Sequence, residues 1–140
     1  MKKLWQCTDG TALLEMIIIA PVALSLMIGG IDFAMGFSTY ATAAKSVRNA
    51  ARYLGSLPPE VGCPIGFSNT AKNLAVTGQM TGGSPLIPGW STSDITVDCT
   101  AGVVTVFAQF TYTSLILASF VPLSASYTLH TQHAERQVGA

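Results

Sequence analysis

Apolar residues form one long run near the amino end of the chain. From Met16 to Ile31 no side chain is charged. With Thr11–Leu14 the run reaches about 20 residues, which is enough for a helix to cross ~30 Å of hydrocarbon. One carboxylate, Glu15, interrupts it. Because an acidic side chain inside a span costs roughly 2.5–3.5 kcal/mol on insertion scales, we expect Glu15 to have a partner. The pattern predicts a membrane-spanning helix with one anomalous charge.

The helical pattern continues beyond Asp32. Apolar residues recur at alternating steps of four and three, which is the spacing of one helical face. They are Phe33, Phe37, Tyr40, Ala44, Val47, Ala51 and Leu54. We predict one helix from Thr11 to Leu54, roughly 65 Å long at 1.5 Å per residue, of which only the first half fits in a membrane. Pro21 removes a backbone hydrogen bond and should kink it, and Gly55 should cap it.

A loop region with one short helix follows. Ser68 or Asn69 can cap a helix that runs through Val76, with Gly78 at its end. The next stretch is rich in Gly, Ser, Thr and Pro, which is typical of a surface loop. It contains Trp90, whose ring either fills the core or is an exposed contact residue.

The period of the apolar pattern changes to two in the last third of the chain. Strands are predicted at Ile95–Cys99, at Val103–Tyr112 after the turn signal Ala101-Gly102, and at Ser124–His133. Three antiparallel strands laid on the exposed half of the long helix would each bury one face. The predicted fold class is therefore α+β: a long amino-terminal transmembrane and stalk helix packed on a small antiparallel sheet of about three strands.

Composition and charge narrow the function classes. Only 10% of the residues are charged and the formal net charge is zero, whereas an average soluble protein has about 25% charged residues. A nucleic-acid-binding protein would need a basic face, and the Lys and Arg residues are too few and too scattered for one. Lys45, Arg48 and Arg52 share one helical face. That face either contacts anionic lipid headgroups or is simply solvated.

The three cysteines are Cys7, Cys63 and Cys99, and no two of them have the spacing of a metal-binding motif. If the carboxyl-terminal part faces an oxidising compartment, Cys63 and Cys99 are the natural disulfide partners. In the chain-entropy model the loop they close would contribute about 4 kcal/mol. The alternative is a pair of buried free thiols.

No motif in the chain predicts catalysis, a cofactor or a metal. His130 and His133 form an HxxH pair, but on a strand this spacing places the two imidazoles on opposite faces, so we expect two solvated histidines and no shared metal. No nucleophile elbow, phosphate-binding glycine loop or zinc-protease motif occurs. We therefore expect no catalytic residue, and an enzyme is the least supported function class.

The amino-terminal region resembles a known family. A short leader with Lys2 and Lys3, then Gly10, four residues and Glu15 before a long apolar helix, resembles the processing site of type IV pilin-like proteins. Residues 10–54 are more closely similar to TadE-like pseudopilins, minor pilins of the tight-adherence (Tad/Flp) pilus system. The shared features are Gly10, Glu15, Pro21 within the span, Asp32-Phe33 at its exit, and Ala51-Arg52-Tyr53 near the helix end.

This resemblance implies a function. A prepilin peptidase would cut between Gly10 and Thr11, and the mature helix would join other pilins or pseudopilins as a minor component of an adhesive pilus. Cleavage creates an ammonium at Thr11, with which Glu15 of the same or a neighbouring subunit can pair. Three residues depart from the family pattern: Thr11 replaces the Phe of many pilins, Met16 replaces a common aromatic residue, and Asp9 stands next to Gly10 in the leader.

The expected organisation has three parts. Residues 1–10 are a cytoplasmic leader, residues 11–54 the transmembrane and stalk helix, and residues 55–140 a periplasmic head. The protein would be single-pass in the bacterial inner membrane, with lipid, the peptidase and other pilins as partners. Two alternatives remain: a plain membrane-anchored periplasmic binding module, in which Gly10 and Glu15 are coincidental, and a pseudopilin of a type II secretion machine. Loss of Met1–Gly10 from the purified protein would argue against the plain anchor.

Overall fold

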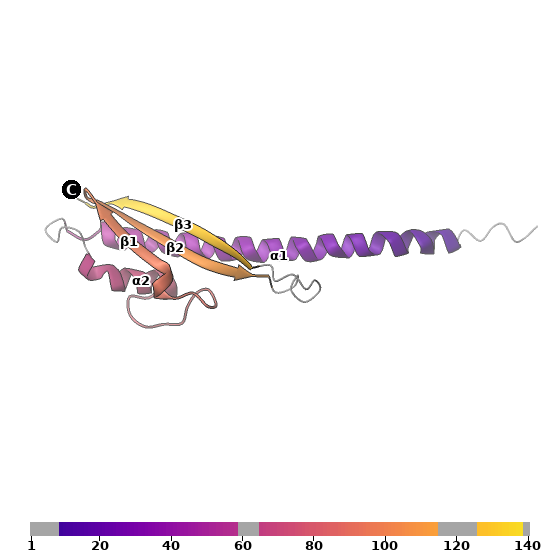
Figure 1. Ribbon diagram of the computed structural model, residues 1–140, viewed down its shortest axis with the longest axis horizontal. Helices are drawn as coiled ribbons and strands as arrows, with labels where there is room; N and C mark the ends of the chain where they lie inside the picture. Colours follow the sequence, from indigo (N-terminus) through magenta and orange to yellow (C-terminus); the bar gives the residue numbers. More distant parts are fainter. Residues whose placement is uncertain (1–8, 59–64, 115–125, 139–140) are drawn as a thin grey trace, which may run out of the picture.

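A long helix dominates the fold, and a small head packs on its carboxyl half (Figure 1). The computed structural model describes residues 9–58, 65–114 and 126–138. Helix α1 runs from Asp9 to Gly55 and is 47 residues long, or about 70 Å at the usual helical rise. The predicted single helix and the α+β class are confirmed.

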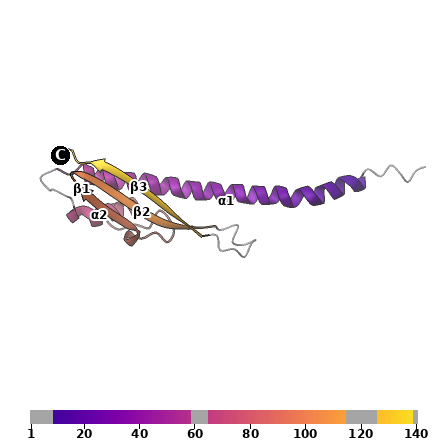
Figure 2. The same cartoon turned by 45° about the horizontal axis from the view of Figure 1, so that its top comes forward.

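Helix α1 passes through Pro21 without a break. Proline has no N–H to donate to the preceding turn, so the helix loses one backbone hydrogen bond there. One turn later the Ser25 hydroxyl donates to the Pro21 carbonyl oxygen at 2.7 Å, a bond that often accompanies a gentle bend. Figure 2 shows α1 curving gently in its amino-terminal half. A distinct kink at Pro21 stays a prediction.

Helix α1 ends at Gly55 as predicted, although the φ of Gly55 is not positive, so this glycine does not adopt a left-handed conformation. The absence of a side chain serves another purpose. A Cβ at Gly55 would lie 2.8 Å from Cγ of Glu135. The Gly55 carbonyl oxygen also accepts a hydrogen bond from the backbone N–H of Val138 at 3.0 Å. Gly55 therefore lets the last strand approach the end of the helix closely.

The sheet is an antiparallel meander with the order β1-β2-β3. Its strands are β1 (Ile95–Thr100), β2 (Val103–Thr113) and β3 (Ser126–Arg136). The predicted strands are confirmed, although the third ends later than expected and its predicted first residue, Ser124, lies outside the described residues. Ala101 and Gly102 connect β1 to β2 with φ values of 50° and 76°. Two positive φ values are what a tight two-residue hairpin turn requires.

Helix α2 (Ser68–Thr77) covers the core beside β1, after a short 3₁₀ turn, Ile65–Phe67. It begins after Phe67 without a side-chain cap, so the expected capping by Ser68 or Asn69 is wrong. It ends as predicted at Gly78, whose φ is 74°.

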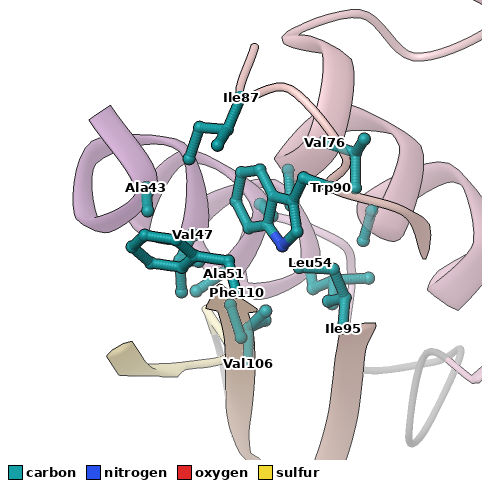
Figure 3. Close-up of a cluster of buried hydrophobic side chains, with 14 of the residues drawn as sticks. Ala43, Val47, Ala51, Leu54, Val76, Ile87, Trp90, Ile95, Val106 and Phe110 are labelled. Atoms are coloured by element: carbon teal, nitrogen blue, oxygen red, sulfur yellow. The ribbon is translucent and has the colours of Figure 1, made fainter. Parts of the chain in front are cut away.

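The core lies between α1, α2 and the inner face of the sheet (Figure 3). Val104, Val106, Ala108 and Phe110 alternate along β2 and point into it. Trp90, just before the 3₁₀ turn Thr92–Asp94, is buried against Phe110 with 5.9 Å between the ring centroids. The interpretation of Trp90 as a core residue is confirmed.

Candidate functional site

The amino-terminal half of α1 has no cover from the rest of the described chain. Its exposed large apolar side chains between Leu13 and Met27 are 58–72% exposed. This segment, within Ala12–Gly55, is long and apolar enough to cross a membrane. A continuous apolar surface of this kind in water would be strongly unfavourable, so it requires lipid or other apolar helices around it.

The predicted cleavage bond and the predicted pairing charge both lie on this uncovered segment. The Gly10–Thr11 bond is in the first turn of α1. Glu15 follows Thr11 by four residues, which places the two positions one turn apart on the same helical face. The Glu15 side chain is exposed and forms no ion pair with another described residue. The structure thus leaves Glu15 accessible to a charge from outside the described chain.

A hydrogen bond ties the sheet to α1 at the end of the uncharged run. The Tyr112 hydroxyl is 3.2 Å from both Oδ1 and the backbone oxygen of Asp32, and it donates to them. Asp32 is only 9% exposed. A Cβ at Gly36 would lie 3.4 Å from the Tyr112 ring, so this glycine lets the ring lie against the helix. Burial raises the pKa of Tyr112, and the neighbouring Asp32 carboxylate raises it further.

An open apolar hollow of about 450 Å³ lies beside this hydrogen bond, and we name it the aromatic groove. It is lined by Phe33, Phe37 and Tyr40 from α1 and by Tyr112, Tyr127 and Leu129 from the sheet, together with Gly29, Asp32 and Gly36. Tyr112 and Tyr127 are directly paired across β2 and β3. The aromatic groove thus joins the sheet tip to the helix where the uncharged run ends.

The apolar face predicted from Phe33 to Leu54 is divided between two environments. Val47, Ala51 and Leu54 are completely buried in the core. Phe33 and Phe37 are 77% and 65% exposed in the aromatic groove. Periodicity placed all these residues on one face, but it did not show where the head ends along the helix.

Cys99, His130 and His133 do not line the aromatic groove. Cys99 takes part in a disulfide bond. Cys63 and Cys7 lie outside the described residues, so the pairing of Cys63 with Cys99 stays a prediction. His130 is exposed on the outer face of β3, while His133 is half-buried, with Nε2 3.2 Å from Oε2 of Glu135. The two imidazoles face opposite sides as expected, but the expectation that both are simply solvated is wrong for His133.

The described residues contain no cluster of three or more His, Cys, Asp or Glu side chains that could hold a metal ion. The candidate functional surface is therefore the uncovered apolar segment of α1 together with the aromatic groove at its end.

We expect Tyr112→Phe to weaken the attachment of the sheet tip to α1. Loss of a hydrogen bond to a carboxylate should lower the free energy of unfolding by about 1–2 kcal/mol. The folded state raises the pKa of Tyr112. Its contribution is therefore fully present below the unfolded pKa of about 10, and it is lost as the pH rises through the folded value. Urea unfolding of the detergent-solubilised chain at neutral and at strongly alkaline pH measures both effects.

The matched control is Tyr127→Phe, because the Tyr127 hydroxyl has no hydrogen-bond partner among the described residues. Tyr127→Phe should unfold like the parent chain at both pH values. Equal unfolding free energies for Tyr112→Phe and Tyr127→Phe would show that the hydrogen bond to Asp32 contributes nothing.

Comparison with known proteins identifies a family match for the amino-terminal helix. The family model described as TadE-like protein matches residues 10–52. No curated protein and no solved structure matches the chain. The matched residues include Gly10, Glu15, Pro21 and Asp32, and they cover nearly all of α1. The resemblance seen in the sequence is thereby confirmed over residues 10–52, where the chain is similar to TadE-like proteins.

Proposed function

We propose that this protein is a minor pilin or pseudopilin, processed by a prepilin peptidase, that takes part in assembly of a tight-adherence type IV pilus. The observation that carries the proposal is the uncovered apolar half of α1. In the bilayer, lipid surrounds these side chains. In a pilus, the corresponding helices of other pilins or pseudopilins replace the lipid, so one surface serves first as an anchor and then as an assembly contact.

The position of the cleavage bond supports processing. The first four N–H groups of a helix have no partner within it, and the first turn opens more easily than the interior. The Gly10–Thr11 bond lies in this turn of α1, and glycine lowers the helix propensity there further. A peptidase could therefore bind this segment in extended form without disrupting the rest of α1.

Glu15 supports assembly after cleavage. Removal of residues 1–10 creates an ammonium at Thr11, one turn from the exposed Glu15 carboxylate. Pairing within one chain, or with the ammonium of a neighbouring subunit, offsets the cost of placing either charge in an apolar setting. The pair between subunits also sets the stagger of the packed helices, because only one register brings the two charges together.

A disulfide at Cys99 supports an extracytoplasmic location for the head. Disulfides form and persist in oxidising compartments such as the bacterial periplasm and are rare in the cytoplasm. The protein would thus cross the inner membrane once, with the head in the periplasm.

Amino-terminal sequencing and intact mass of the protein from membranes of cells with and without prepilin peptidase test the proposal. We expect the mature chain to begin at Thr11 when the peptidase is present and to retain the leader when it is absent. A Gly10→Leu variant should keep the leader in both strains, because a bulky side chain beside the scissile bond obstructs the peptidase. An intact leader in the peptidase-containing strain would contradict processing and favour a plain periplasmic anchor.

A further inference from the structure

We propose that the aromatic groove lies in the headgroup layer of the membrane and is filled by lipid, so that the head rests on the bilayer and is not held above it on a free stalk. The inference rests on one part of the proposed function, namely that α1 spans the membrane. It does not depend on cleavage or on pilus assembly.

The depth of the sheet tip follows from the bond between Tyr112 and Asp32. Asp32 is the first charged residue after the uncharged run, so it lies at the outer boundary of the hydrocarbon when α1 spans the bilayer. The Tyr112 hydroxyl donates to Asp32, and Tyr127 pairs with Tyr112 across the sheet. Figure 1 shows the end of β2 and the start of β3 reaching along α1 toward its amino-terminal half. The sheet tip is therefore at the depth of Asp32.

The groove has the composition of a membrane interface. Tyr residues are enriched at the headgroup level, where an apolar ring and a polar tip are both satisfied. Phe33 to Tyr40 lie within about 12 Å of Asp32 along the helix axis. The headgroup layer of each leaflet adds roughly 5–8 Å to the hydrocarbon, so most of the groove falls within or next to this layer. Asp32, which accepts the Tyr112 hydrogen bond, is the only charged residue lining the groove among those described.

Lipid is the occupant favoured by the continuity between the apolar surface of the span and that of the aromatic groove. Phe33 and Phe37 are strongly exposed, and they follow directly on the same helix from the exposed apolar residues of the span. The apolar surface of the span and that of the groove are therefore continuous, without a polar boundary except for the buried Asp32. A bilayer that covers the first surface would also cover the second.

The basic residues farther along α1 take no part in this contact. Lys45 follows Asp32 by about 20 Å along the helix axis. This distance exceeds the Debye length of ~8 Å at physiological ionic strength, and Arg48 and Arg52 are farther still. The face formed by Lys45, Arg48 and Arg52 was interpreted either as a contact with anionic lipid headgroups or as a solvated face. The distance from Asp32 favours the solvated face. Contact of the groove with lipid should be insensitive to salt.

Tryptophan quenching by brominated lipid tests the proposal on the full, uncleaved chain. The parent carries Trp5→Phe, so that buried Trp90 is its remaining tryptophan. The Tyr127→Trp change is made in this parent. The protein is reconstituted at one copy per disc into nanodiscs of phosphatidylcholine that is brominated near the top of its acyl chains. After subtraction of the parent signal, Tyr127→Trp should lose about half or more of its emission relative to unbrominated discs, as expected of an interfacial aromatic side chain.

Two matched reporters complete the design. Phe107→Trp, on the outer face of the sheet and roughly 17 Å from Tyr112 along β2, should keep nearly all its emission. Leu24→Trp, in the middle of the span, should be quenched because its side chain faces the acyl chains. Phe33→Trp reports on the same groove from the helix side, should the change at Tyr127 disturb the sheet.

The outcomes separate the inference from the proposed function. Quenching at Leu24→Trp without quenching at Tyr127→Trp and Phe33→Trp would overturn the inference and leave the membrane span intact. No quenching at Leu24→Trp would overturn both. Equal quenching at Phe107→Trp and Tyr127→Trp would also overturn the inference, because it would show that the sheet as a whole contacts lipid. The emission maximum of Tyr127→Trp could also shift to the blue only with two copies per disc, and without quenching. That result would show that a second copy of the chain fills the groove, and it would overturn the proposal that lipid does.

Discussion

A Glu15→Gln variant should insert into the membrane normally and yet fail to enter the assembled pilus. Insertion is not impaired, because glutamine is less costly than a carboxylate in an apolar setting. Assembly is impaired, because the ammonium of the mature chain is left without its partner between packed helices. Removing one member of a buried ion pair costs about 3–5 kcal/mol, which corresponds to a loss of more than a hundredfold in an association equilibrium.

Two measurements on the same cells separate these steps. The amount of Glu15→Gln protein in the inner membrane should match the parent, while its amount in sheared pili, or in complexes with other pilins, should fall to background. Met16→Leu is the matched control, since it changes the neighbouring side chain without altering charge or apolar character, and it should assemble normally. Normal pilus content of Glu15→Gln would refute the pairing role.

A Trp90→Ala variant should destabilise the head by about 3–5 kcal/mol, the usual loss when a buried tryptophan is truncated. The indole lies among Val47, Leu54, Val76 and Phe110, between α1, α2 and the sheet (Figure 3). Its removal would leave a cavity at the junction of all three. A head of this size has a small core, so the loss is a large part of its total stability.

The conservative variant distinguishes ring volume from the indole N–H. Trp90 Nε1 is buried and has no hydrogen-bond partner among the described residues. Trp90→Phe removes this unpaired donor, which offsets about 1–3 kcal/mol of the lost packing. Its unfolding free energy should therefore fall much less than that of Trp90→Ala. Urea unfolding of the detergent-solubilised chain, followed by near-ultraviolet circular dichroism, measures both.

Phe107→Ala on the outer face of the sheet is the control for general loss of aromatic area, because this ring is 39% exposed. It should cost less than Trp90→Ala. A loss below about 1 kcal/mol for Trp90→Ala would mean that the ring does not hold the three elements together.

The sequence predicted the elements because their signals are local. An uncharged apolar run indicates a span wherever it lies, and steps of four and three indicate a helix that continues into the head. Alternation along Val103–Tyr112 correctly identified the inward-facing side chains of β2. Ala101-Gly102 marked the hairpin, because few residue pairs adopt two positive φ values. Gly10, Glu15 and Asp32, on which the resemblance to TadE-like proteins rests, also lie within one continuous helix and within the matched residues 10–52.

Errors arose where a residue's role depends on a neighbour that is distant in sequence. Gly55 ends α1 as expected, but the sequence did not show that it also provides space for Glu135 of β3. His133 was expected to be solvated, because no local signal shows that it faces Glu135 and is half-buried. In both cases the missing information was the position of β3 against the end of α1.

The sequence by itself determined that the protein has an apolar helix with one carboxylate, a small antiparallel sheet and a TadE-like amino-terminal pattern, since each follows from residues that are neighbours in the chain. Only the tertiary structure decided where the head ends along α1. That boundary is set by the Tyr112 hydroxyl and Asp32, which are 80 residues apart in sequence. A contact of this kind depends on how the whole sheet packs on the helix. The aromatic groove beside it therefore becomes visible only when the chain is folded.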